Sequence, residues 1–556
     1  MSDNRSSMGR RRRIKTRLAA LTPIPSYRLK LVFLILSLGL TALLVRVASL
    51  QVFQSDDLET RARSIQTENK KPLGTRRSIL DRNGRLIAID EERFRLWAHP
   101  RYFSFPGDLS EGSRKPYEIA EKISSLISRP VSEIVATLEG RSSGVRLAES
   151  LDSEVANKLK RLRISGLDLE AYPQRVYPQG SLFANVVGFL NHDRFPQAGL
   201  EFSLNNQLMR QEKTSTLRRG ADGTPLPDGM KTGTFLRDDI DLHLTLDARL
   251  QEVAIKALSK QVQKWQAKKG VVIVMNVQNG EILALASTPT YDPNRYWKYS
   301  TALFKEWSVQ DLFEPGSTFK PINLALALEE GVINPDGTVE DNGLVNVGGW
   351  PLSNWDRKPN GTLNYPEVLQ VSSNVAMVNI MRNLDPASYW EWLRLLEIDK
   401  SPATDLPGAV AGQLKSKEVF TRQPIEPAVA SFGQGFSITP LKLVQLHALI
   451  ANGGKMVTPH ITRGFPEKVG DVIKGESDTN NQILRPDVAK TVLEWMETVV
   501  EKGSGKGSKV KGYRIAGKTG TAQKAQNGSY YNGRICSFVA SLPVDNPRYV
   551  VLVVVD

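Results

Sequence analysis

A long apolar run near the N-terminus limits what this chain can fold into. Residues 29–53 read LKLVFLILSLGLTALLVRVASLQVF and include only two charges, Lys30 and Arg46. As a helix rising about 1.5 Å per residue, the run spans about 37 Å, which crosses a hydrocarbon core of about 30 Å with some tilt. The alternatives are a buried core helix and a cleaved signal peptide, but signal peptides have apolar regions of only about 7–15 residues. The run therefore predicts one membrane-spanning helix.

The charge before this run indicates its orientation. Residues 1–30 carry nine Lys or Arg against one acid, which is +8 of the formal net charge of +14. The positive-inside rule keeps this basic tail, residues 1–28, in the cytoplasm and exports everything after Phe53. A basic tail can bind nucleic acid, but beside a membrane span its simpler roles are orientation and contact with anionic lipid, so we expect no nucleic-acid partner. The expected location is the plasma (inner) membrane, with the later domains on its periplasmic side.

Cysteine and histidine usage excludes several kinds of site. Cys536 is the only cysteine, so an intramolecular disulfide and a cysteine-based metal site are excluded. A Ser-His triad is not formally excluded. The histidines show no ligand spacing such as H-E-x-x-H; they are His99, His192, His243, His447 and His460. We therefore expect neither a metal nor another cofactor.

The exported part divides in two by its pattern. Residues 54–240 mix short strand-like and helical stretches with many Arg and Pro, and a tight turn at Asn83 and Gly84 between two apolar stretches predicts a hairpin. Residues 211–241 are rich in Gly, Thr, Arg and Asp, as is typical of a linker or an extended excursion. We therefore predict that a second domain begins at residue 241.

This second domain, residues 241–556, has strands at both ends. Residues 244–265 predict a helix with Asp247 near its start, and residues 271–276 and 282–287 predict an antiparallel hairpin. A helical middle follows, and the chain closes with three strand-like pieces, RIAGKTGTAQ, CSFVASLP and YVVLVVVD. The pattern predicts an α+β domain whose one sheet is built from distant segments.

The first chemical signal is Ser317 followed by Lys320, in EPGSTFKPINLALALEEG. The segment predicts the opening of a helix with both side chains on one face. A lysine can take the proton of a serine only if burial or a neighbouring cation destabilises its ammonium form. The backbone N–H of a serine at a helix N-terminus also points outward, where it can stabilise an oxyanion. The alternative is a capping serine with a surface lysine, because Ser-x-x-Lys is common by chance.

A second element follows 55 residues later, where Ser372, Ser373 and Asn374 interrupt the apolar helical stretch LQVSSNVAMVNIMRNL. Ser372 is suited to relay a proton between Lys320 and either Ser317 or a leaving amine. Asn374 is suited to hold a substrate amide. The alternative is an ordinary helix-end cap.

A third element near the C-terminus has two interpretations. Residues 512–519 fit the phosphate-binding pattern G-x-x-x-x-G-K-[ST], whereas residues 518–521 read Lys-Thr-Gly-Thr, as in one wall of a serine acyl-transfer site. A phosphate loop needs an apolar strand before it and a helix after it, and here a polar stretch precedes and strand-like residues follow. Lys-Thr-Gly-Thr also occurs at residues 231–234, inside the polar linker, where it is interpreted as a solvated loop.

The acyl-transfer interpretation gives each residue of the third element a role. Gly520 lets a substrate approach the backbone. Thr519 and Thr521 offer hydroxyls to a carboxylate. Lys518 supplies positive charge, which also disfavours the protonated form of Lys320.

The ordered triple Ser-x-x-Lys, Ser-x-Asn and Lys-Thr-Gly resembles the penicilloyl serine transferases, which include the penicillin-binding proteins and the serine β-lactamases. Further segments look like class B penicillin-binding proteins, and with the triple they cover about residues 29–556. Ser-x-Asn and the short region before residue 241 look more like the division-type (penicillin-binding protein 3) branch. The further segments are RRSILDRNG, RVYPQGSLFANVVGF, AGLE, PTYDPN, FEPGSTFKP and SFGQGFSITPLKL.

The resemblance implies a penicillin-binding transpeptidase domain at 241–556, an elongated pedestal (dimerisation-type) domain at 54–240 and one membrane helix. It implies a peptidoglycan DD-transpeptidase in which Ser317 attacks the D-Ala-D-Ala bond of a stem peptide, with Lys320 as general base. Ser372 and Lys518 would relay protons, and the backbone N–H groups of Ser317 and Thr521 would form the oxyanion hole. β-Lactams would acylate the same serine. The implied protein partners are a polytopic glycan polymerase and other division proteins.

The chain departs from the family pattern in two places. Arg77 stands where the family has Gly after the first Arg of its RG-x-I-x-DRNG element. The chain ends at Asp556, where relatives continue through a closing helix, so we expect a C-terminally truncated domain with a poorly covered last strand. Three other functions stay open: an elongation-type transpeptidase, a carboxypeptidase or β-lactamase in which water resolves the acyl-enzyme, and a β-lactam sensor or division scaffold with little catalysis.

Overall fold

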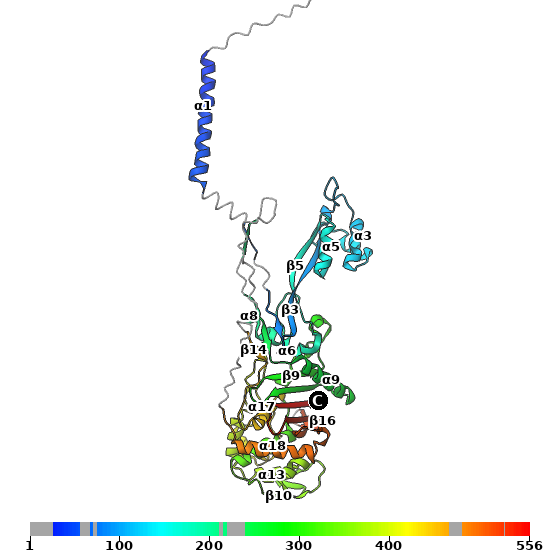
Figure 1. Ribbon diagram of the computed structural model, residues 1–556, viewed down its shortest axis with the longest axis vertical. Helices are drawn as coiled ribbons and strands as arrows, with labels where there is room; N and C mark the ends of the chain where they lie inside the picture. Colours follow the sequence, from blue (N-terminus) through cyan, green and yellow to red (C-terminus); the bar gives the residue numbers. More distant parts are fainter. Residues whose placement is uncertain are drawn as a thin grey trace, which may run out of the picture. The chain divides into compact units, whose positions relative to one another are not determined.

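The computed structural model forms two compact units (Figure 1). One comprises Met1–Pro72 with Lys213–Leu236, and the other comprises Leu73–Glu212 with Arg237–Asp556. The basic tail up to residue 25 and the first Lys-Thr-Gly-Thr, at 231–234, lie outside the described residues. The structure describes residues 26–55, 67–70, 75–210, 215–218, 240–465, 481–526 and 529–556.

The first unit contains the predicted apolar helix. α1 spans Ser26–Ala48 and continues as a π-helical turn, η1, over Ser49–Phe53. The stretch Tyr27–Val52 is long and apolar enough to cross a membrane, and within the described part of the chain no other helix is. Its side chains are exposed along almost the whole helix, which distinguishes it from a buried core helix. β1 (Thr67–Lys70) pairs antiparallel with β6 (Ser215–Arg218) in the same unit.

The second unit begins with the pedestal, whose strands belong to a six-stranded sheet of order β14-β7-β2-β3-β4, with β5 also paired to β3. Strands β7 and β14 of this sheet come from the domain after residue 240. The predicted hairpin is confirmed, because β2 pairs antiparallel with β3 across the turn at Asn83 and Gly84. Gly84 has a φ of +82°, which favours glycine. Arg77, in the position of the family glycine, lays its guanidinium 5.2 Å from the ring centroid of Phe465. The strands are β2 (Ile79–Leu80), β3 (Leu86–Ala98), β4 (Val145–Leu151), β5 (Leu167–Val176), β7 (Leu242–Leu244) and β14 (Thr462–Gly464).

The pedestal has its own apolar core where three helices pack against β3, β4 and β5. Leu96 of β3 and Phe103 are fully buried there together with Ile123 and Ile134. The helices are α3 (Pro116–Ile127), α4 (Val131–Leu138) and α5 (Ser153–Arg161).

A buried ionic cluster connects segments of the pedestal that are far apart in the sequence. Glu201 bonds to Arg76 and to Arg175, each at 2.7 Å, and Asp90 bonds to Arg175 at 3.3 Å and to Arg194 at 2.7 Å. Burial opposes ionisation of Asp90, but the two arginines outweigh burial and lower the pKa of Asp90. Three of these five residues, Arg76, Arg175 and Glu201, lie in the family-like segments of the pedestal, so those segments have a structural role.

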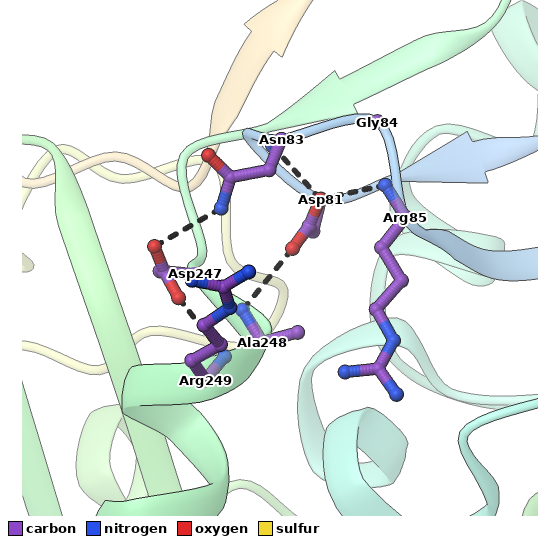
Figure 2. Close-up of a pocket in the computed structure, with 7 residues that line it drawn as sticks. All are labelled: Asp81, Asn83, Gly84, Arg85, Asp247, Ala248 and Arg249. Atoms are coloured by element: carbon purple, nitrogen blue, oxygen red, sulfur yellow. Dashed lines mark hydrogen bonds between the residues drawn. The ribbon is translucent and has the colours of Figure 1, made fainter.

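The turn of the first hairpin also contacts the start of the C-terminal domain (Figure 2). Asp81 accepts hydrogen bonds from the backbone N–H groups of Asn83 and Arg85, and its other oxygen accepts from Ala248 N at 3.1 Å. The Asn83 amide donates to Asp247 at 3.0 Å. Asp247 is the N-cap of the first helix of the domain, α9 (Ala248–Lys264), as the sequence predicted.

The C-terminal domain is built around a five-stranded antiparallel sheet of order β15-β16-β17-β8-β9. The predicted hairpin of β8 and β9 is confirmed, and β8 pairs on its other edge with the C-terminal strand β17. The predicted α+β domain, with one sheet made from distant segments, is therefore confirmed. The strands are β8 (Gly270–Asn276), β9 (Ile282–Thr288), β15 (Ala516–Gln526), β16 (Ser529–Leu542) and β17 (Tyr549–Val555).

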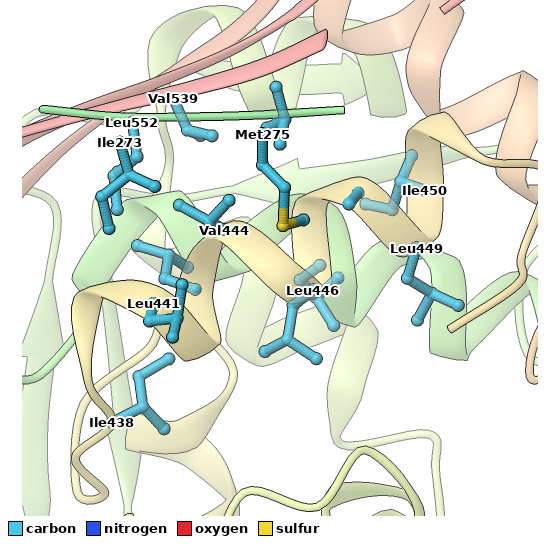
Figure 3. Packing of buried hydrophobic residues seen from close by; sticks show 14 of the residues in the cluster. Ile273, Met275, Ile438, Leu441, Val444, Leu446, Leu449, Ile450, Val539 and Leu552 are labelled. Carbon is cyan, nitrogen blue, oxygen red and sulfur yellow. The ribbon is translucent and has the colours of Figure 1, made fainter. Parts of the chain in front are cut away.

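Helices cover both faces of this sheet. Val272 and Val274 of β8 pack in one cluster with residues of α9. The alternate residues Ile273 and Met275 point to the other face, toward α17 (Pro440–Ala451), whose residues are all buried (Figure 3). Alternation along a strand thus places two separate apolar layers on the sheet. The prediction for the last strand needs one correction: β17 lies between β16 and β8, so both of its edges are paired, and its outer side chains are half-buried near α9.

The remaining elements that position the site lie between the two ends of the sheet. α11 and α17 are central helices, and α18 packs against β15. Two short hairpins, β10 with β13 and β11 with β12, lie before α12. The bounds are η7 (Gly316–Phe319), α11 (Lys320–Glu329), β10 (Thr338–Asp341), β11 (Leu344–Val347), β12 (Trp350–Ser353), β13 (Gly361–Asn364), α12 (Tyr365–Val371), α13 (Asn374–Met381), α14 (Pro386–Leu395) and α18 (Pro486–Glu501).

Candidate active site

Ser317 lies in a tight 3-10 turn, η7, that leads directly into α11. Lys320 N–H closes the turn by donating to the carbonyl of Ser317. Gly316 N–H donates to Gly433 O at 2.9 Å, and a side chain at Gly433 would overlap the backbone of Gly316. The predicted opening of a helix at Ser317 and Lys320 is therefore confirmed. Ser317 is half-buried, so its hydroxyl sits at the edge of the core and not on an open surface.

Lys320 is fully buried, which rules out the surface-lysine alternative. Its Nζ bonds to Ser372 O at 2.5 Å, to Asn374 Oδ1 at 2.8 Å and to Ser372 Oγ at 3.3 Å. Burial, and then the charge of Lys518, hold the pKa of Lys320 well below its usual value. These are the two causes that the sequence argument required.

The contacts of Lys320 fit a neutral amine. A neutral amine has two N–H donors and one lone pair. The two shortest contacts are to the backbone oxygen of Ser372 and the side-chain oxygen of Asn374, which can only accept hydrogen bonds. With both N–H groups used there, the lone pair of Lys320 is left to accept a proton.

Ser372 has an unusual backbone conformation that turns its side chain toward the lysines. It ends α12 with a φ of 59°, in the left-handed region. The neighbouring Ser373 is the cap of α13, because its hydroxyl accepts from Ala376 N at 2.9 Å. The helix-cap alternative thus applies to Ser373 and leaves the hydroxyl of Ser372 free for other contacts.

Lys518 reaches the same hydroxyl from the sheet. It lies on β15 and is fully buried, with Nζ 3.0 Å from Ser372 Oγ and 3.0 Å from Thr519 O. Burial lowers the pKa of Lys518 to about 7. The Ser372 hydroxyl is therefore within hydrogen-bonding distance of two buried lysines whose pKa values are both lowered.

The strand position of Lys518 also overturns the phosphate-loop alternative. Ala516–Gln526 is a strand, so no helix follows the lysine. The residues before the first glycine of that pattern form a short 3-10 turn, Lys506–Ser508, and not an apolar strand.

The rest of the third element lies beside the nucleophile turn. Thr521 is exposed, and its carbonyl oxygen faces Gly316. Gly520 is buried, and a Cβ there would overlap Ser537 Oγ and lie 2.8 Å from Thr318 Cγ2. Glycine is therefore required at Gly520 by packing within the protein, a reason that the sequence argument did not include.

Thr519 has a hydrogen-bond partner that the sequence did not indicate. Its hydroxyl lies 2.7 Å from the hydroxyl of Ser504, an exposed residue. Ser504 N–H also donates to Gln370 O, on the helix that leads to Ser372. The turn at Ser504 thus joins the second and third elements.

Asn354 is a second residue that the sequence argument missed. Its Oδ1 accepts from Asn374 N at 2.9 Å, from Val375 N at 3.2 Å and from Ser373 Oγ at 3.2 Å. Its Nδ2 donates to both oxygens of Asp341, at 2.9 and 2.8 Å. Asn354 therefore caps α13 from outside and fixes the segment that carries Ser372 and Asn374.

Comparison with known proteins agrees with this geometry. Residues 270–556 match the family described as penicillin binding protein transpeptidase domain, and residues 72–223 match the penicillin-binding protein dimerisation domain. A protein of Mesostigma viride named peptidoglycan D,D-transpeptidase FtsI homolog is 35% identical over 95% of this chain and 91% of its own length. Peptidoglycan D,D-transpeptidase FtsI of Escherichia coli K12 is 29% identical over 96% of this chain and 87% of its own.

A solved structure shares the fold. Penicillin binding protein 3 of Mycobacterium tuberculosis, complexed with aztreonam, aligns with a TM-score of 0.64 at 23% identity, over 87% of this chain and 90% of its own. The family resemblance inferred from the motifs is confirmed. The chain belongs to the penicillin-binding protein transpeptidase family.

Proposed function

We propose that this protein is a peptidoglycan D,D-transpeptidase that cross-links stem peptides through an acyl-enzyme on Ser317. The observation that carries the proposal is the Ser372 hydroxyl, which lies 3.0 Å from Lys518 Nζ and 3.3 Å from Lys320 Nζ. A hydroxyl between two lysines of lowered pKa is a short path for protons, and Lys320 directly follows the turn that carries Ser317. The relatives named peptidoglycan D,D-transpeptidase support the choice of substrate.

In the acylation step, the lone pair of Lys320 takes the proton of Ser317 as Oγ attacks the carbonyl of the penultimate D-Ala. The tetrahedral oxyanion is stabilised by the backbone N–H groups of Ser317 and Thr521. The proton then passes from Lys320 through Ser372 to the leaving D-Ala nitrogen, and the C–N bond breaks. The amine of a neighbouring stem peptide attacks the ester and restores Ser317.

The remaining residues bind the donor peptide. The hydroxyls of Thr519 and Thr521 and the charge of Lys518 bind its terminal carboxylate. Asn374 holds a substrate amide after its side chain releases Lys320. β-Lactams acylate Ser317 in the same way, but the amine of the opened ring remains tethered to the acyl group and blocks the approach of an acceptor, so they stay attached.

The apolar helix α1 fits a single-pass anchor with the N-terminus in the cytoplasm and the transpeptidase domain outside. In this arrangement the enzyme works in septal wall synthesis beside a polytopic glycan polymerase, which α1 and the pedestal contact. The support is the basic tail before α1 and the two relatives named FtsI.

Adduct mapping with a fluorescent penicillin tests the proposal. The full-length protein is expected to form one covalent adduct, and mass spectrometry of peptides is expected to place it on Ser317. Ser317→Ala should lose the adduct, whereas Ser203→Ala, at an exposed serine of the pedestal, should keep it. An adduct that survives in Ser317→Ala would refute the assigned nucleophile.

A further inference from the structure

A buried histidine contacts the residue that follows the proposed nucleophile. His447 lies on α17, has no exposed surface, and places Nε2 2.8 Å from the carbonyl oxygen of Thr318. The two residues are 129 positions apart in the sequence. α17 packs on the inner face of the sheet, so His447 joins the central helix to the turn that carries Ser317.

The chemistry of this contact fixes the state of the ring. A carbonyl oxygen can only accept, so Nε2 carries the proton and donates. Burial lowers the pKa of His447 to about 4, which keeps the ring neutral and leaves Nδ1 without a proton. Nδ1 is buried, and among the described residues it has no hydrogen-bond partner. An unpaired buried nitrogen costs free energy, so the favourable feature of an imidazole here is its single N–H donor.

Thr318 lies in the nucleophile turn beside Ser317 and contacts the strand that carries Thr521. Its hydroxyl donates to Pro315 O at 2.7 Å, inside the nucleophile turn. Its methyl group fills the space where a side chain on Gly520 would lie, next to Thr521. Ser317 immediately precedes Thr318, and Thr521 immediately follows Gly520. Thr318 therefore links the nucleophile turn to β15 next to both proposed oxyanion donors.

We propose that His447 is a positioning residue for acylation. The hydrogen bond from His447 Nε2 to the carbonyl of Thr318 fixes the nucleophile turn against β15. It thereby keeps the two oxyanion donors at the spacing that the transition state needs. The inference rests on the proposed function, because it concerns the same acyl-enzyme. It predicts an effect on the chemical step and not on the initial binding of the ligand.

A matched pair of variants tests the donor. Gln and Met have similar length and volume, but only Gln has N–H groups that can reach Thr318 O, so His447→Gln and His447→Met differ mainly in the donor. Stopped-flow acylation by benzylpenicillin separates the dissociation constant of the first complex from the acylation rate constant. His447→Met is expected to lower the acylation rate constant about tenfold to a hundredfold, with the dissociation constant unchanged, and His447→Gln should recover most of the loss.

Two controls separate positioning from general damage. The ring of His460 also contacts a backbone carbonyl, that of Thr458 at 3.0 Å, so His460→Met should acylate at the wild-type rate. Rates are normalised to the fraction of molecules that form an adduct, and melting temperatures are measured in parallel. A variant that only misfolds would have fewer active molecules with a normal rate constant.

Equal rate constants for His447→Gln and His447→Met would overturn the inference, as would a wild-type rate constant in His447→Met. The proposed function fails separately. If the wild-type protein forms no adduct on Ser317, the assigned chemistry is wrong, whereas a normal wild-type adduct with an unaffected His447→Met rejects only the role of His447.

Discussion

The hydroxyl of Ser372 lies 3.0 Å from Nζ of Lys518, although the two residues are 146 positions apart and belong to a helix end and to a strand. The same hydroxyl lies 3.3 Å from Lys320. Among the described residues, neither lysine forms a salt bridge with an acidic side chain. The Ser372 hydroxyl is therefore the polar group that both lysines share. The first prediction follows from this arrangement.

Ser372→Ala should slow acylation by benzylpenicillin by about a hundredfold to ten-thousandfold, because the proton then lacks its path to the leaving nitrogen. The dissociation constant of the first complex should change little. Stopped-flow fluorescence measures both quantities. Ser373→Ala is the neighbouring control: it removes the cap of α13 and should lower the melting temperature while slowing acylation less. A larger rate loss in Ser373→Ala than in Ser372→Ala would contradict the relay.

The lowered pKa values predict a bell-shaped pH profile. Lys320 acts as a neutral amine, so acylation should be lost as the pH falls through its lowered pKa. Lys518 binds a carboxylate in its charged form, so acylation should also decline as the pH rises through about 7. Lys518→Arg keeps its charge at high pH, so it should move the alkaline limb of the profile to higher pH and leave the acid limb at the same pH. The measurement is the second-order acylation rate constant against pH; an unmoved alkaline limb in Lys518→Arg would refute the assignment.

The pKa of Lys518 also affects stability. In the unfolded chain Lys518 titrates near its ordinary value of 10.5, and in the folded protein near 7. Between these values the unfolded state binds more protons, so this group makes the folded state more stable as the pH rises. Lys518→Met removes this pH dependence. Its free energy of unfolding should therefore exceed that of the wild type most at pH 7 and below, and the difference should shrink toward pH 10.5. Urea denaturation at several pH values gives this difference, and a constant difference would argue against a buried, shifted lysine.

The sequence predicted the parts of the site that are short local patterns. Ser317 and Lys320 lie three residues apart, so their spacing alone indicated a shared face, and Ser372 and Asn374 were found because they interrupt an apolar stretch. Ser504 and Asn354 were missed because their partners lie 15 and 20 positions away and neither residue type is unusual in a loop. The sheet order was outside the reach of local patterns for the same reason: β17 pairs with β8 from the other end of the domain.

Asn354 gives a prediction about the frame of the site. Asn354→Ala leaves the cap of α13 and the carboxylate of Asp341 without their partner, and should lower the free energy of unfolding by about 2–4 kcal/mol. Since Asn374 N and Val375 N are freed next to Ser372, acylation should also slow. Urea denaturation with a parallel adduct assay measures both effects. Asn383→Ala, at an exposed asparagine beyond α13, is the control. It should change the free energy of unfolding and the acylation rate little.

The lifetime of the acyl-enzyme distinguishes the transpeptidase from the alternatives in which water resolves the ester. A transpeptidase reserves deacylation for an amine, so the penicilloyl adduct on Ser317 should persist for many hours after free penicillin is removed. An added D-amino acid, which offers an amine acceptor, should be incorporated into the product when a thioester donor with D-Ala is used. Gel fluorescence follows the adduct, and mass spectrometry separates the hydrolysed product from the aminolysed one. Rapid loss of the adduct with only hydrolysed product would assign the protein to carboxypeptidase or β-lactamase chemistry, because the same acylation geometry would then be serving water as the acceptor.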